Sequence, residues 1–532
     1  MKKTVLKLVA VLLALCMLSG CSFLGRLMQP ADSALTFARM EYERPDLDAI
    51  ERQRVLVVDM ANDKQNINNI AAQINYFYAY YDAFYTNYNL ATIYHDSDLT
   101  DAYWIGETEF CSQAAPRVEQ MLEQLYRDLA NSPMREALED EQYFGEGFFQ
   151  QYTGEPFYDE GYMSLAAEEA RLENLYYELY TKSAELMEND LDAFYQEYGQ
   201  QFADLLVQMI RIRQEMADYF GYEDYAQLAY DMYYYREYTP QQTARYMEQL
   251  GQAVRDIYVR GMEDGRWEWG LILTNENRIL DYVRQAAKAM GGKIQEAYSF
   301  MEKGGYYNIS NDGNMYDGGY EVYLTSYNVP YLFHKTHNLN LDKLSVAHEF
   351  GHYAHDYVCQ GTYASIDVCE VLSQAMEYLS VLYVDGSGRE EAYKMIETSV
   401  VMAENACFTL FELRAYELEG DQLTAENLTD LYEDTCSIFG MDWDDPYGFT
   451  AIQHFYLYPM YTSSYVYSAD VALQIYQQEK TESGKGLETY LQCLNTNEIY
   501  LMDFVQQNGL ESPFKEERAT VIRNTLETLL GY

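Results

Sequence analysis

The sequence reads SVAHEFGHYAHDYVCQGTYASIDVCEVLSQAME from residue 345 to residue 377. Within this stretch, His348 to His352 has the pattern H-E-x-x-H. On a helix, two histidines four residues apart lie on one face, so both imidazoles can reach the same metal ion. Glu349 points toward the same rim, where it can act as a base on a water molecule. The stretch therefore predicts a helix that supplies two zinc ligands and a base.

A catalytic zinc site needs a third protein ligand and keeps its fourth position open. Glu370 follows His352 by 18 residues and lies on a second helical pattern, from Val368 to Tyr378. We therefore expect His348, His352 and Glu370 to hold one Zn²⁺ ion. Clustering favours this site, because six of the seven histidines fall within residues 334–454.

Two polar residues beside the predicted ligands have less definite roles. Gln374 lies one helical turn beyond Glu370, where it can either orient that ligand or be an ordinary polar residue of the helix. His355 shares the face of His348 but lies a turn too far for direct ligation. We expect His355 to support the site or to belong to the core.

Length and charge limit the classes of protein that the chain can represent. Its 532 residues exceed one compact core and correspond to about two to four domain-sized units or to one large helical body. The formal net charge of −49 disfavours binding to nucleic acids and to anionic membrane surfaces. Inside a cleft, the same excess of acid would favour cationic substrates.

The N-terminus has the features of a secretory signal. Lysines come first, an apolar run of 11 residues follows at 8–18, and Leu18-Ser19-Gly20-Cys21 resembles the bacterial lipobox. The run is too short to span a bilayer. We expect residues 1–20 to be a lipoprotein signal peptide and Cys21 to carry the lipid; an uncleaved anchor and an ordinary signal are the alternatives.

The rest of the chain divides by pattern. Residues 21–45 look like a tether, residues 46–205 form an N-terminal helical region, and residues 206–532 form the catalytic region. At 303–333, turn-forming Gly, Asn and Asp residues separate short runs of Tyr, Val and Leu, which are typical of strands. This pattern predicts a small β-sheet just before the H-E-x-x-H helix. Its outer strand either pairs with an extended peptide or is a structural hairpin.

An uncharged element lies about 100 residues after the metal motif. Residues 446–469 contain no charged residue, although 23% of the chain is charged, so this element is buried or lines a cleft. His454, Tyr458, Tyr461 and Tyr465 are spaced 4, 3 and 4 residues apart. They would therefore line up on one helical face, securely only from Tyr461 because Pro459 weakens the start of the helix. The alternative is a tyrosine-rich core stripe.

Several of these motifs resemble the thimet oligopeptidase and oligoendopeptidase F family of metallopeptidases. The resemblance rests on HEFGHYAH at 348–355, the E-x-x-S-Q-x-x-E segment at 370–377, and HFY with YPMY and Tyr465 at 454–465. Looser matches are RIRQEMADYFGYEDYAQLAY at 211–230 and NVPY at 328–331. Together they span about residues 211–475.

The resemblance implies a mainly α fold, with a large clam-like helical body, a deep central channel and a small β-sheet next to the zinc helix. It implies that His348, His352 and Glu370 are the metal ligands and that Glu349 is the catalytic base. Tyr465 would correspond to the tyrosine that stabilises the oxyanion, with His454 and Tyr461 assisting.

Residues and resemblance together predict a zinc-dependent oligoendopeptidase that hydrolyses peptide bonds in short peptides at the extracytoplasmic face of a bacterial membrane. The expected partners are short peptide substrates and, through a lipid anchor at Cys21, the membrane; nucleic acid is excluded. A related metallocarboxypeptidase and a non-catalytic peptide-binding lipoprotein are the alternatives. The sequence leaves the oligomeric state open.

Overall fold

The computed structural model describes residues 35–532 except 363, 385–387 and 442–444. The predicted signal peptide at 1–20 and the predicted lipid site at Cys21 lie outside the described residues. The described chain is mainly helical with one small sheet, which confirms the predicted fold class. Within the described residues, no helix is both long enough and apolar enough to cross a membrane.

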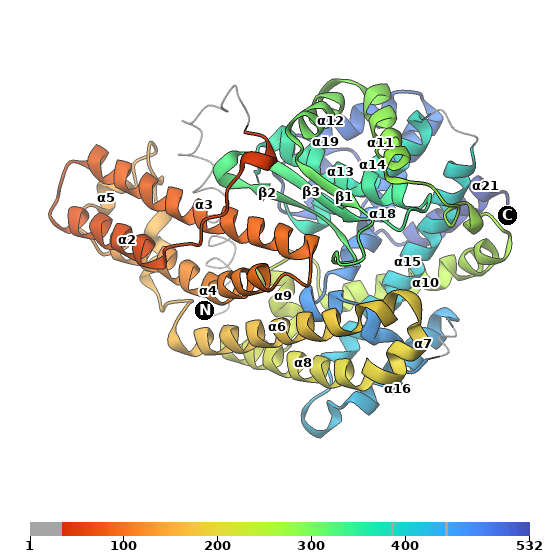
Figure 1. The fold of residues 1–532 in the computed structure, drawn as a ribbon, viewed down its shortest axis with the longest axis horizontal. Coiled ribbons are helices and arrows are strands. Elements are labelled where there is room, and N and C mark those ends of the chain that lie inside the picture. The colour runs from red at the N-terminus through yellow and green to blue at the C-terminus, as the bar shows by residue number, and fades with distance from the viewer. Residues whose placement is uncertain (1–34, 363, 385–387, 442–444) are drawn as a thin grey trace.

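From residue 35 to residue 232, the described chain forms helices and no strand (Figure 1). They are α2 (Leu47–Asn62), α3 (Ile67–Ser97), α4 (Ala102–Ala130), α5 (Arg135–Leu138), α6 (Glu160–Asn189), α7 (Leu191–Phe194), α8 (Gln200–Phe220) and α9 (Tyr225–Met232). Apolar faces of α2, α3 and α4 enclose a hydrophobic core of their own. The predicted boundary between regions at 205 and 206 stays a prediction.

The last part of the predicted tether packs on the folded body. The ring of Phe37 lies 4.2 Å from the ring of Tyr331, centroid to centroid. Tyr42 donates a hydrogen bond of 2.5 Å to Glu107 of α4. Ordered contacts with the body therefore begin before residue 45.

Three helices and a three-stranded sheet precede the metal motif. They are α10 (Pro240–Glu263), α11 (Glu276–Met290), α12 (Gly292–Gly304), β1 (Tyr307–Ser310), β2 (Gly319–Leu324) and β3 (Val329–Lys335). The strand order is β1-β3-β2, with β1 parallel and β2 antiparallel to β3. The sheet begins within the predicted segment 303–333, and β3 continues two residues beyond it, to Lys335. Strand β3 is buried along its whole length, and β2 is an edge strand.

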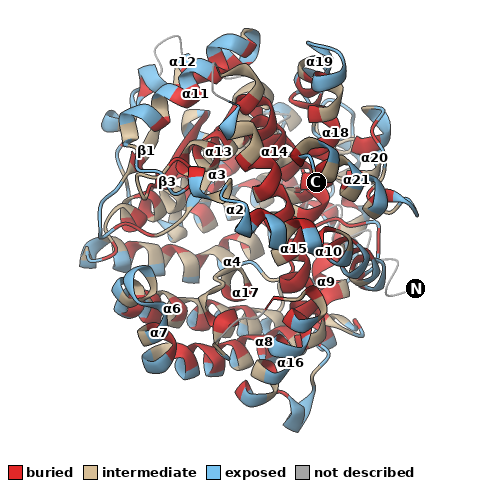
Figure 2. Cartoon of the chain, turned by 90° about the vertical axis from the view of Figure 1, so that its right-hand side faces the viewer, coloured by how far each residue is buried: buried red, intermediate tan, exposed pale blue. Residues whose placement is uncertain are grey.

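The remaining helices build the main core. They are α13 (Asp342–Cys359), α14 (Ile366–Tyr383), α15 (Arg389–Ala415), α16 (Ala425–Phe439), α17 (His454–Leu457), α18 (Thr462–Thr481), α19 (Lys485–Cys493), α20 (Leu501–Gln507) and α21 (Arg518–Leu530). Figure 2 shows buried residues concentrated on α13, α14 and α15. Their burial gives these helices few ways to shift, so side chains on them have fixed positions.

A glycine sets how closely α13 and α14 approach each other. A Cβ at Gly351 would lie 2.6 Å from the Cα of Ser373, so only glycine permits this crossing. Gly351 directly precedes His352, and Ser373 follows Glu370 by one helical turn. The close crossing therefore brings Glu370 against the two histidines of the motif.

Candidate metal centre and active-site cavity

The three predicted metal ligands converge in the structure. The Nε2 atom of His348 lies 3.1 Å from Oε2 of Glu370, and Nε2 of His352 lies 3.7 Å from the same oxygen. One ligand atom from each residue lies within 4.8 Å of the others. Zinc bonds of about 2.0–2.1 Å in a tetrahedron place ligand atoms about 3.3 Å apart. These two histidines and the carboxylate therefore fit a zinc ion.

Glu377 fixes the orientation of the first histidine. Its carboxylate lies 2.7 Å from Nδ1 of His348, so a proton on Nδ1 leaves the lone pair of Nε2 free toward Glu370. Lys394 of α15 donates to the other oxygen of Glu377 at 2.5 Å and to Glu397 at 2.6 Å. The chain Lys394–Glu377–His348 is therefore a hydrogen-bonded support behind the ligand.

Charge at the centre matches the needs of a cation. Burial raises the pKa of Glu370, but His348 and His352 outweigh this effect and lower it to about 2, so the carboxylate is ionised. Burial lowers the pKa of His352 to about 4, which keeps that imidazole neutral. Burial also opposes charge on His348, yet Glu370 and Glu377 raise its pKa well above the usual value. The attraction that retains a proton there would equally favour a metal ion.

Two hydroxyl groups hold Glu370 in place. Ser373 donates to its Oε2 at 2.9 Å, and Tyr461 donates to its Oε1 at 2.5 Å. The hydroxyl of Tyr461 is therefore engaged with a metal ligand, although the resemblance implied that it assists at the oxyanion. Among the described residues, the side-chain amide of Gln374 makes its hydrogen bonds elsewhere: it donates at 2.9 Å to the carbonyl of Tyr465 and to Ser468. The hypothesis that Gln374 orients Glu370 is wrong, because this side chain turns toward α18.

His355 is a buried residue away from the ligand atoms. Its Nε2 lies 3.1 Å from the carbonyl oxygen of Thr496, and its Nδ1 lies 3.3 Å from Asp356. The cluster of metal-binding groups does not include it. It belongs to the core, in keeping with the expectation that it is not a ligand.

Glu349 stands beside the metal centre with its carboxylate in the cavity. Its side chain is 9% exposed and makes no hydrogen bond to any residue that the structure describes. Burial raises its pKa to about 8; Glu370 and Glu377 act in the same direction, and His348 opposes them. A carboxylate with a pKa near neutrality can both accept and return a proton.

The tyrosine element lies next to the histidines, as the sequence suggested. It is not one helix: α17 ends at Leu457, the chain turns through Met460 with φ +67°, and α18 begins at Thr462. The turn still brings Nε2 of His454 to 3.2 Å from the hydroxyl of Tyr465. The Tyr465 ring lies 6.4 Å from the ring of His348, centroid to centroid. The element therefore faces the metal centre with two hydrogen-bonding groups.

Two buried arginines hold this turn, and sequence reasoning did not single them out. Arg213 of α8 donates to the carbonyl oxygens of Phe455 and Tyr456. Arg236 donates to the carbonyl of Met460 at 3.0 Å and forms a two-pronged ion pair with Asp367, three residues before Glu370. The arginines therefore connect the tyrosine element to the helix that carries the third ligand.

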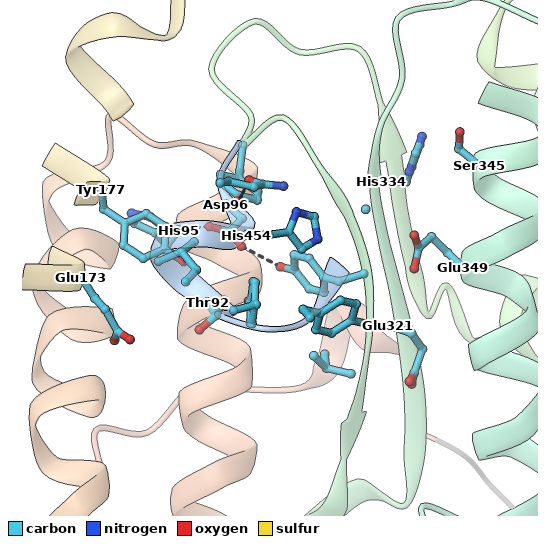
Figure 3. A pocket seen from close by; sticks show the side chains of 18 of the residues that line it. Thr92, His95, Asp96, Glu173, Tyr177, Glu321, His334, Ser345, Glu349 and His454 are labelled. Atoms are coloured by element: carbon cyan, nitrogen blue, oxygen red, sulfur yellow. Dashed lines mark hydrogen bonds and ion pairs between the residues drawn. The ribbon is translucent and has the colours of Figure 1, made fainter. Parts of the chain in front are cut away.

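The metal centre opens into a cavity of about 1140 Å³. One wall comes from α3, α4 and α6, and the other from β2, β3, α13 to α15, α17 and α18. Figure 3 shows the two walls: Thr92, His95, Asp96, Glu173 and Tyr177 face Glu321, His334, Ser345 and Glu349. Tyr320 of β2 reaches across and donates to Asp96 at 3.0 Å. This cavity between two halves of a helical body corresponds to the expected channel.

The edge strand β2 borders the cavity beside Glu349. Gly319, Tyr320, Glu321 and Val322 all line it. The strand on its inner side is β3, and the sheet ends at β2 on the other side. An extended chain could therefore pair with β2 by main-chain hydrogen bonds. The cavity is large enough for several residues of a peptide.

The fold and the site together define a class of protein, namely a mainly helical protein with a cluster of metal-binding groups beside an internal cavity. Comparison with known proteins supports a peptidase. Residues 37–156 match the family model of the Peptidase M3 N-terminal domain. No curated protein sequence shows a significant match to the chain.

Solved structures share the fold over nearly the whole chain. One described as an oligoendopeptidase F is 18% identical, with a TM-score of 0.78, covering 94% of this chain and 99% of its own. PZ peptidase A with an inhibitor is 18% identical, with a TM-score of 0.77 and coverage of 93% and 99%. An oligoendopeptidase F from Bacillus anthracis is 17% identical, with a TM-score of 0.76 and coverage of 94% and 99%. At sequence identities this low, the structural similarity shows that the fold is shared and nothing more.

The match of residues 37–156 to the Peptidase M3 N-terminal domain and the shared fold confirm the resemblance to the M3 peptidase and oligoendopeptidase F family that was drawn from the motifs. The domain match supports a peptidase. The lipoprotein assignment stays a prediction.

Proposed function

We propose that the protein is a zinc-dependent oligoendopeptidase that hydrolyses short peptides. The observation that carries this proposal is convergence. His348, Glu349 and Tyr465 line one wall of a single cavity, and ligand atoms of His352 and Glu370 lie within 4.8 Å of His348. An edge strand lies on the same wall.

The bound zinc ion would polarise the peptide carbonyl and lower the pKa of water at the site. Glu349 is the group that takes the proton from the attacking water and returns it to the leaving amine. Burial raises the pKa of Glu349 to about 8. Because this pKa lies near neutrality, the same carboxyl group can take up the proton and release it again.

The negative charge that develops on the carbonyl oxygen needs a hydrogen-bond donor. Tyr465 supplies one, because burial raises the pKa of its hydroxyl well above the usual value and keeps it protonated. His454, at 3.2 Å from that hydroxyl, positions it or donates alongside it. A donor of this kind typically lowers the barrier by about 3 kcal/mol.

We also propose that the mature protein is held at the outer face of a bacterial membrane by a lipid on Cys21. Support comes from the lysines, the short apolar run and the Leu-Ser-Gly-Cys sequence of the N-terminus. Cys21→Ser should release the protein from the membrane fraction and leave its peptidase activity unchanged. A Cys21→Ser protein that still sediments with membranes would contradict the anchor.

The test of the catalytic proposal is Glu349→Gln. This variant should bind one zinc ion with wild-type affinity, yet cleave an internally quenched peptide at least 10³-fold more slowly, the order expected for loss of general acid-base catalysis. Glu426→Gln, on an exposed turn of α16, is the matched control.

Blocking both ends of the quenched peptide separates the alternatives. An endopeptidase still cuts it internally, whereas a carboxypeptidase requires a free C-terminus. Zinc-loaded wild-type protein that binds peptides without cleaving any member of a mixed library would contradict catalysis. Glu349→Gln protein with unchanged turnover would contradict the mechanism.

A further inference from the structure

His334 is a buried histidine that the proposed catalytic steps do not use. It lies near the end of β3, where its partner in the antiparallel pair is Gly319 of β2. Its side chain is 7% exposed and lines the cavity. Neither ring nitrogen has a hydrogen-bond partner among the described residues. A buried imidazole without partners is costly, so its presence calls for a function.

His334 and Glu349 both lie next to the Cα of Gly319, which carries no side chain. A Cβ added to Gly319 would lie 2.4 Å from Nδ1 of His334 and 2.8 Å from Oε1 of Glu349. Glycine at 319 therefore leaves room for these two groups to approach each other from β3 and from α13. Figure 3 shows them on the same side of the strands, between the sheet and α13.

The two groups are chemically complementary. Burial lowers the pKa of His334 to about 4, with His337 and His348 acting in the same direction. The ring is therefore neutral, with one N–H donor and one acceptor nitrogen. Glu349 has an acceptor carboxylate that makes no hydrogen bond within the described chain. A donor and an acceptor, both buried and both without partners, face each other across one glycine.

We propose that His334 is a positioning residue for Glu349, with the N–H on Nδ1 donating a hydrogen bond to its carboxylate. The bond satisfies one oxygen of the carboxylate and restricts its rotation. The other oxygen stays available to the water. The effect of His334 on catalysis rests on the proposed peptidase function. The hydrogen bond between His334 and Glu349 does not.

Nuclear magnetic resonance tests the contact without any turnover. Selective ¹⁵N-histidine labelling produces signals from only seven histidines, and the His334 signal is assigned by its loss in His334→Asn. We expect a ring protonated at Nδ1 and bare at Nε2. In Glu349→Gln, the Nδ1 proton should move upfield, because an amide oxygen is a weaker acceptor than a carboxylate. A ring protonated at Nε2, or no response to Glu349→Gln, would overturn the proposal.

Three variants test the consequence for peptide cleavage. Asn places its amide nitrogen near the position of Nδ1, Gln places it near Nε2, and Leu has no polar atom. His334→Asn should keep kcat within about threefold of wild type, whereas His334→Gln and His334→Leu should lower it roughly tenfold to a hundredfold. KM and zinc content should stay unchanged in all three. Equal losses in the Asn and Gln variants, or a change confined to KM, would contradict a role through Nδ1 and Glu349.

Binding of peptide to inactive protein tests whether His334 contacts the substrate directly. The dissociation constant of an uncleaved peptide should be equal for Glu349→Gln and for Glu349→Gln/His334→Leu. Weaker binding by the double variant would assign His334 to the peptide instead. If wild-type protein cleaves no peptide while the resonance responds to Glu349→Gln, the proposed function fails and the contact between His334 and Glu349 stands.

Discussion

Replacing Glu377 by Gln should weaken zinc binding while leaving all three ligands in place. In the structure, one oxygen of Glu377 accepts from Nδ1 of His348 at 2.7 Å and the other accepts from Lys394 at 2.5 Å. A Gln side chain has one acceptor oxygen, so its NH₂ group must face one of these two donors. If the NH₂ group faces His348, that histidine loses its acceptor. If the NH₂ group faces Lys394, the lysine keeps only its bond to Glu397, and His348 donates to a neutral amide oxygen instead of a carboxylate.

The size of the effect follows from the change in hydrogen bond. A hydrogen bond to a charged group contributes about 1.5–3 kcal/mol and a neutral one about 0.5–1.5 kcal/mol, a loss of roughly 1–1.5 kcal/mol. A loss of this size weakens zinc binding by about tenfold, which lies at the lower end of the 10–100-fold range typical for residues that support a metal ligand.

Competition with a chromogenic chelator measures the zinc dissociation constant of each variant. Glu426→Gln, exposed on α16, removes the same charge at a distance and should behave as wild type. Circular dichroism of the metal-free proteins checks that Glu377→Gln is folded. A folded Glu377→Gln protein with wild-type zinc affinity would refute the idea that Glu377 orients His348.

Three further expectations follow from other contacts. Arg236→Lys should lower the free energy of unfolding by about 3 kcal/mol in urea titrations, since lysine cannot form both bonds to the buried Asp367. Arg171→Lys, at the exposed pair with Glu168, should change the free energy of unfolding little. Equal losses of stability in the two variants would contradict this reasoning. Burial lowers the pKa of His355, but neighbours including Asp356 raise it to about 10. Its charge should thus stabilise the fold fully below pH about 6.5 and progressively less up to pH 10. His355→Leu should therefore lower Tm more at pH 6 than at pH 10, and a pH-independent difference would count against that charge. Chelation should abolish peptide cleavage and lower Tm, because an ion that binds only the folded state stabilises it; added zinc should restore both, and activity that survives complete zinc removal would contradict zinc dependence.

The convergence of the candidate metal ligands could be predicted from sequence because helical geometry acts locally. His348 and His352 share a face through a spacing of four residues, and no other part of the fold is needed to bring them together. Glu370 came from a second helical pattern and the family resemblance, and the close crossing at Gly351 places it correctly. The element without charged residues was also predictable, since a long uncharged stretch in a chain this acidic indicates an element that is buried or lines a cleft.

The supporting residues were not predictable in the same way. Gln374 and Glu377 both follow Glu370 on α14, at one and two helical turns. Spacing alone places both near the ligand, and the angle at which α13 crosses α14 decides that Glu377 meets His348. Arg213 and Arg236 lie more than 100 residues before Glu370. No local pattern connects them with the turn at Met460, which they hold by its carbonyl groups.

The sequence by itself predicted the helices around the motif and named His348, His352, Glu370 and Glu349 as the candidate site residues, because helical periodicity and the ligand preferences of zinc can be read along the chain. Only the tertiary structure decided which groups surround them. It engaged Tyr461 with Glu370, placed Tyr465 beside His348, and put His334 opposite Glu349 across Gly319. These contacts depend on how helices and strands pack. Packing is a property of the whole core, in which each side chain takes its place only after distant segments have met.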